Sequence, residues 1–110
     1  STRLETRVGG ADVNPYLMAA AGIAAGLYGI EHKLPLDAPR ITGNAYEAKD
    51  AAQLPKNLAE ATAAMRASSV ASEILGAELV EHLAITREWE WRQFADAVTD
   101  WELRRYLEII

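Results

Sequence analysis

The chain has 110 residues and a formal net charge of −5, with 50% hydrophobic and 25% charged residues. This is the length and composition of one globular domain, and it excludes an intrinsically disordered chain. The absence of cysteine excludes a disulfide scaffold, a thiol nucleophile and a cysteine-ligated metal. The acidic balance argues against general nucleic-acid binding, which needs a basic surface. A chain of this size can bury one modest core.

Residues 1–10 are expected to form a strand and a turn. Between residues 2 and 8, apolar or threonine side chains alternate with the charged side chains of Arg3, Glu5 and Arg7. A period of two is typical of a strand, because successive side chains point to opposite faces. Gly9 and Gly10 are expected to end this strand.

An Ala- and Gly-rich helix is predicted over residues 14–32. Asn14 suits the N-cap, and Pro15 suits the first helical position. The helix carries small or apolar residues on every side and has no charge between Tyr16 and Ile30. That uncharged stretch is shorter than the ~20 residues a membrane span needs. We therefore expect a helix that is buried in something larger.

Residues 33–57 contain three prolines and no clear periodicity, which predicts a long loop. Residues 58–110 are expected to be helical. Asn57 and Glu60 resemble one capping box, and Thr99 and Glu102 a second. Ser68 or Ser69 can cap a short helix that ends near Gly76, and a long helix is predicted from residue 77 to 97. The predicted fold is mainly α, with one N-terminal strand followed by about five helices.

The alternation of Arg3, Glu5 and Arg7 is the most promising chemical feature. On a strand, their side chains leave one face at spacings of roughly 6.5–7 Å. A carboxylate is a suitable ligand for a hard divalent cation, and arginines bind phosphate or carboxylate oxygens. Spacing alone favours an exposed strand face with alternating charges.

The two histidines have simpler interpretations. His32 lies at the predicted end of the first helix, where an imidazole can act as a cap. His82 could share a metal with Glu78, but two ligands are too few, and a surface helical pair is the better interpretation.

Several ordered motifs resemble the catalytic domain of the glutamine synthetase family, in its C-terminal part. The family pattern R-I/L-E-x-R is followed by a turn, by A-x-N-P-Y-L opening a small-residue helix, and by later loop and helix motifs. The matching segments here are residues 3–7 (RLETR), 10–17 (GADVNPYL), 25–33 (AGLYGIEHK), 43–46 (GNAY), 54–61 (LPKNLAEA) and 98–107 (VTDWELRRYL). The turn at residues 8–12 (VGGAD) resembles more closely the turn of the branch that makes gamma-glutamylpolyamines. The gamma-glutamylputrescine synthetases belong to that branch.

This resemblance implies an ATP-dependent ligase that joins glutamate to ammonia or an amine through a gamma-glutamyl phosphate. It implies Mg²⁺ or Mn²⁺ as cofactor and Glu5 as one of the metal ligands. It also implies that Arg3 contacts nucleotide phosphate, and that Arg7 is catalytic, contacting the transferring phosphoryl and the glutamyl group. In some bacterial members the tyrosine of the N-x-Y loop is adenylylated, which makes Tyr46 a candidate modification site. Its neighbours depart from that branch's pattern.

The family chain is several times longer, and most of its metal and nucleotide ligands precede the segment that matches here. We therefore expect residues 1–110 to be a C-terminal fragment of an α+β catalytic domain that is inactive by itself. The expected partners are the rest of that domain, glutamate, an amine or ammonia, and other copies of the parent in a homo-oligomer, with no nucleic acid and no membrane. The expected compartment is the cytoplasm. The alternative is a stand-alone helical interaction or scaffold module that has kept the family's framework without its reaction.

Overall fold

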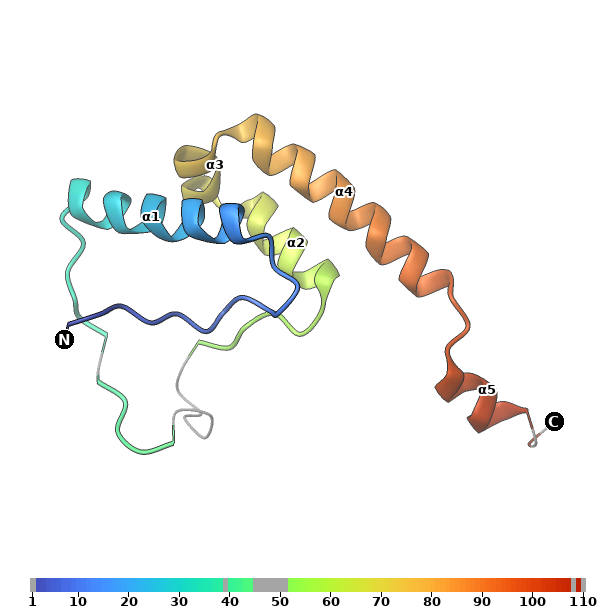
Figure 1. Ribbon diagram of the computed structural model, residues 1–110. Coiled ribbons are helices and arrows are strands. Elements are labelled where there is room, and N and C mark those ends of the chain that lie inside the picture. The colour runs from blue at the N-terminus through green and yellow to red at the C-terminus, as the bar shows by residue number, and fades with distance from the viewer. Residues whose placement is uncertain (1, 39, 45–51, 108, 110) are drawn as a thin grey trace. The chain divides into compact units, whose positions relative to one another are not determined.

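The computed structural model describes residues 2–38, 40–44, 52–107 and 109 (Figure 1). In chain order its helices are α1 (Pro15–Glu31), α2 (Leu58–Ala67), α3 (Ser69–Leu75), α4 (Ala77–Asp96) and α5 (Asp100–Tyr106). The contacts divide the chain into two units. The first comprises residues 1–51 and 73–75, and the second comprises residues 52–72 and 76–110.

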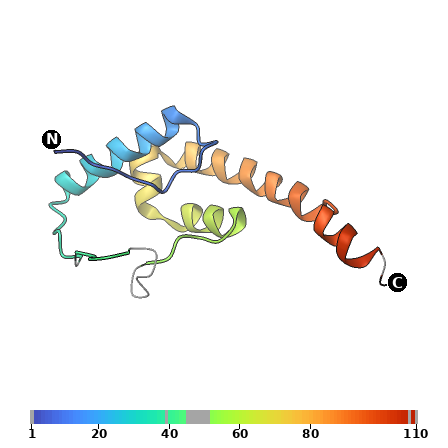
Figure 2. The same cartoon turned by 60° about the horizontal axis from the view of Figure 1, so that its bottom comes forward.

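The predicted N-terminal strand is wrong. Residues 2–8 are not part of a sheet, and the described residues contain no strand at all. A strand is defined by backbone hydrogen bonds to a neighbouring strand. The described part of the chain offers no such neighbour, so the alternating pattern alone cannot produce one. Instead, the segment lies alongside α1 and runs in the opposite direction to the helix, as both views show (Figures 1 and 2).

The start of α1 follows the local rules that the sequence predicts. The side-chain oxygen of Asn14 accepts hydrogen bonds from the N–H groups of Tyr16 and Leu17, at 3.0 and 3.2 Å. Pro15 occupies the first turn, where its missing N–H costs no helical hydrogen bond. The helix ends at Glu31, and His32 is its C-cap. No residue of α1 is buried, although the helix has no charge before its last residue.

The core of the second unit lies between α2 and α4, which pack against each other. Its buried residues are Thr62 on α2 and, one turn apart on α4, Val80 and Ala84. The Thr62 hydroxyl donates to the Leu58 carbonyl at 2.7 Å, so its burial leaves no unpaired donor. Among the described residues of α4, burial is confined to these two, and Phe94 near the end of the helix is exposed.

Local caps set most of the remaining helix ends. Asn57 accepts from the Glu60 N–H at 2.9 Å, and Ser68 accepts from the Ala71 N–H at 3.1 Å. Thr99 and Glu102 form a complete capping box for α5. Gly76 separates α3 from α4 with a φ of +86°, a backbone region that favours glycine. None of the described helices is long and apolar enough to cross a membrane.

Candidate functional site

The three charged side chains of the N-terminal segment meet on one exposed side. The Arg7 Nε atom donates to Glu5 Oε1 at 2.7 Å, and a second Arg7 nitrogen lies at the same distance from that oxygen. A terminal nitrogen of Arg3 lies 3.5 Å from Glu5 Oε2. The side chains of Arg3 and Arg7 are 75% and 77% exposed, and that of Glu5 is 47% exposed.

By itself, this cluster has the net charge of an anion site. Both carboxylate oxygens of Glu5 already face a guanidinium group. Two arginines around one carboxylate leave one excess positive charge, with N–H donors still open to solvent. Such donors suit phosphate or carboxylate oxygens. Because the ion pairs are exposed, they contribute little to folding.

A divalent cation needs more ligands than this cluster offers. Mg²⁺ or Mn²⁺ takes several oxygen ligands, of which Glu5 supplies one carboxylate. In the described part of the chain, no group of three or more His, Asp or Glu side chains could hold a metal ion. The described residues therefore do not form a metal site by themselves.

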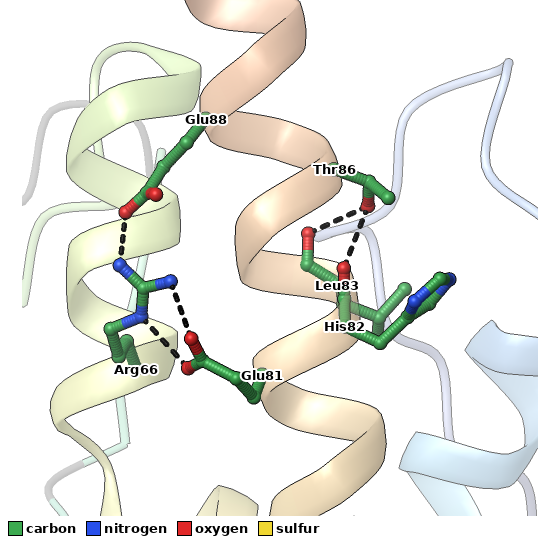
Figure 3. A network of polar contacts seen from close by, with 6 residues as sticks. All are labelled: Arg66, Glu81, His82, Leu83, Thr86 and Glu88. Carbon is green, nitrogen blue, oxygen red and sulfur yellow. Dashed lines mark hydrogen bonds and ion pairs between the residues drawn. The ribbon is translucent and has the colours of Figure 1, made fainter.

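The other residues singled out from the sequence lie elsewhere. Tyr46 falls outside the described residues, so its modification stays a prediction. His32 caps α1, with its Nδ1 3.0 Å from the Tyr28 carbonyl oxygen and its ring stacked on the Tyr28 ring. A carbonyl oxygen only accepts hydrogen bonds, so Nδ1 is the donor in this contact. The other ring nitrogen, Nε2, lies 3.5 Å from a carboxylate oxygen of Glu73. His82 contributes its main-chain carbonyl to the Thr86 hydroxyl (Figure 3).

Sequence reasoning missed a network that joins α2 to α4. Two nitrogens of Arg66 donate to the two carboxylate oxygens of Glu81, both at 3.1 Å, and a third donates to Glu88 (Figure 3). Desolvation lowers the pKa of Arg66, but the hydrogen bonds and charges of Glu81 and Glu88 together raise it above its ordinary value. The sequence signal for this network was the spacing of seven residues between the two glutamates. That spacing places them two turns apart on one face of a helix.

Comparison with known proteins decides the family. Residues 1–106 match the family model described as "Glutamine synthetase, catalytic domain". The chain belongs to the glutamine synthetase family. Its RLETR segment, which carries the exposed charged cluster, lies within the matched residues.

Three relatives match along nearly the whole chain. A type-1 glutamine synthetase 2 of Dictyostelium discoideum is 50% identical over all of this chain. A glutamate–isopropylamine ligase of a Pseudomonas species is 46% identical over all of it, and a gamma-glutamylethanolamide synthetase of Streptomyces coelicolor is 47% identical over 98% of it.

The match covers only a small part of these relatives. The chain spans 22%, 24% and 23% of their respective lengths. More than three quarters of each relative therefore has no counterpart in residues 1–110. No solved structure shows a significant match to this chain.

Proposed function

We propose that residues 1–110 are the C-terminal part of the catalytic domain of an ATP-dependent ligase that joins glutamate to ammonia or an amine. The observation that carries the proposal is the family match over residues 1–106, which includes the exposed cluster of Arg3, Glu5 and Arg7. In the overall reaction, ATP phosphorylates the γ-carboxylate of glutamate. The amine then displaces phosphate, so that ADP, phosphate and a γ-glutamyl amide are formed.

Each residue of the cluster has a proposed role that fits its charge. Arg3 contacts nucleotide phosphate, and Arg7 contacts the phosphoryl group being transferred and the glutamyl group. Both arginines present exposed N–H donors, which can neutralise negative charge on oxygen as it develops. Glu5 supplies one carboxylate to a Mg²⁺ or Mn²⁺ site whose other ligands come from the rest of the catalytic domain.

We further propose an organic amine as the nitrogen substrate. Relatives at 46% and 47% identity are named for isopropylamine and ethanolamide, whereas a glutamine synthetase of Thermotoga maritima is 36% identical. The D. discoideum relative, at 50%, is named a glutamine synthetase, so ammonia stays the competing substrate. The longer ligase of which residues 1–110 are proposed to be a part is also proposed to act as a homo-oligomer.

The test is a chimera of the D. discoideum relative in which residues 1–106 of this chain replace its matching region. We expect ATP-dependent γ-glutamyl amide formation from glutamate when isopropylamine, ethanolamine, methylamine or ammonia is supplied. Arg7→Gln should lower kcat by about a hundredfold or more, because a charged donor to the reacting oxygens is removed. The matched control is Arg87→Gln, which removes an arginine of α4. Its kcat should stay within about twofold of the kcat of the unsubstituted chimera.

Three results would contradict the proposal. They are a folded chimera without activity, an Arg7→Gln variant as active as the Arg87→Gln control, and amide synthesis by residues 1–110 alone. An inactive but well-folded chimera would favour the alternative, a non-catalytic interaction module. The exposed apolar surface of α1 is the observation that supports that alternative.

A further inference from the structure

A small cavity lies between α2 and α4 in the second unit. It has a volume of about 250 Å³ and is lined by Ala59 and Ala63 from α2 and by Glu88, Trp91 and Arg92 from α4. The three residues of α4 are spaced i, i+3 and i+4, and the two alanines are four residues apart, so each set lies on one face of its helix. The packing of α2 against α4 brings the two faces together.

The charges of this cavity are not neutralised among the described residues. Glu88 accepts a hydrogen bond from Arg66 through one carboxylate oxygen (Figure 3), and its other oxygen has no partner in the described part of the chain. Arg92 follows Glu88 at a spacing that suits an ion pair. The Arg92 guanidinium group nevertheless has no hydrogen bond or ion pair with any described residue. The cavity therefore presents an unpaired cation beside a carboxylate oxygen that is still available.

The rest of the lining is apolar. Ala59 and Ala63 contribute methyl groups, and the half-buried Trp91 contributes its ring, whose centroid is 5.5 Å from that of Phe94. Aromatic and methyl surface of this kind suits a short apolar group. The volume lies just below the ~300–1,000 Å³ that is typical of pockets for drug-sized ligands, so a smaller molecule fits.

We propose that this cavity binds a small zwitterion, a free α-amino acid with an apolar side chain. The Arg92 guanidinium group donates to the ligand's carboxylate, and the available oxygen of Glu88 accepts from its ammonium group. Trp91 and the two alanines contact the apolar side chain. A simple anion would be repelled by Glu88 and a simple cation by Arg92. The site shares no residue with the charged cluster of the N-terminal segment, so it goes beyond the proposed ligase function.

The first test compares three ligands that differ by one charged group. L-Leucine carries both groups, 4-methylpentanoate lacks the ammonium group, and 3-methylbutylamine lacks the carboxylate. Binding to residues 1–110 is measured by the NMR shift of the Trp91 indole N–H at neutral pH, and Trp91→Phe identifies that signal by its loss. We expect the Kd of L-leucine to be about fivefold or more below that of either analogue. An analogue that binds as tightly as L-leucine, or no shift with L-leucine near its solubility limit, overturns the proposal.

The second test removes the two charges one at a time. Arg92→Gln and Glu88→Gln should each raise the Kd of L-leucine about fivefold or more. The control for the first is Arg87→Gln, which removes an arginine of α4 outside the lining. The control for the second is Glu81→Gln, which also removes a partner of Arg66 but lies outside the lining. Each control should leave the Kd within about twofold, and a control as impaired as its partner variant overturns the proposal.

A third test fills the cavity without changing any charge. Ala63→Leu places a larger side chain in the cavity, whereas Ala64→Leu adds the same side chain at the next, exposed position of α2, outside the lining. Leucine is a good helix former, so circular dichroism should show the same helix content in both variants. Ala63→Leu should abolish the L-leucine shift and Ala64→Leu should keep it. Equal binding by the two variants contradicts the proposed site.

Discussion

At the scale of single residues, the charged cluster shows how much a short spacing can determine. In any extended segment, side chains two residues apart leave the backbone on the same side. Arg3, Glu5 and Arg7 therefore meet even though the predicted strand is absent. The structure adds that Glu5 is ion-paired to both arginines, which spacing alone did not predict.

A second residue-scale feature is the carboxylate of Glu102, which caps the start of α5. The main-chain N–H of Thr99 donates to the Glu102 carboxylate at 2.8 Å, and the Thr99 hydroxyl donates to it at 2.9 Å. The hydrogen bond from the Thr99 main chain, followed by that from its hydroxyl, lowers the pKa of Glu102 below its ordinary value of 4.5. A lowered folded-state pKa means that the cap's contribution is complete above pH 4.5. The contribution is lost as the pH falls through the folded pKa.

We expect α5 to lose helicity as the pH falls from 4.5 through the folded pKa of Glu102. The measurement is the NMR chemical shift of the Thr99 amide against pH, with the titration midpoint expected below 4.5. Glu102→Gln, which cannot ionise, should remove this step from the titration. A midpoint at or above 4.5 in the unsubstituted chain would contradict the prediction.

At the scale of elements, α2 and α4 are held together by a small core and by the Arg66 network. The core contains only Thr62, Val80 and Ala84 as buried residues among those described. Arg66 adds a bidentate pair with Glu81 and a further hydrogen bond to Glu88. Two glutamates that share one arginine repel each other when that arginine is removed.

We therefore expect Arg66→Ala to lower Tm more than Arg87→Ala, which removes an arginine of α4 outside the network. Because the network is partly exposed, high salt should reduce the difference between the two variants. Thermal denaturation at low and high ionic strength measures it. A double-mutant cycle with Glu81→Gln should show a coupling between positions 66 and 81, and additive effects would rule out the network as a source of stability.

At the scale of the whole chain, burial is concentrated in one place. The described part of the chain buries three residues, all of them in α2 and α4, and none in α1 or α5. Regions with few buried contacts open with low free energies. Residues 1–110 should therefore not unfold as one cooperative body.

Native-state hydrogen exchange tests this expectation. Amides of α4 around Val80 and Ala84 should exchange about tenfold or more slowly than those in the middle of α1. In the chimera, where the rest of the catalytic domain is available, this difference should shrink. Equal protection of α1 and α4 in the isolated chain would show that α1 is stabilised by contacts within these residues.

The sequence by itself determined the local features of this protein. The Asn14 cap with Pro15, the Asn57 cap and the capping box of Thr99 and Glu102 depend on side chains within three residues of the backbone groups they satisfy. The family was also readable from ordered motifs, and the match over residues 1–106 confirms it.

Features that depend on distant partners could not be predicted from the sequence in this way. Tertiary structure decided that residues 2–8 form no strand, because pairing needs a neighbour that alternation cannot supply. It also decided the Arg66 network, whose members are 15 and 22 residues apart, and the exposure of α1, which depends on what lies beside the helix.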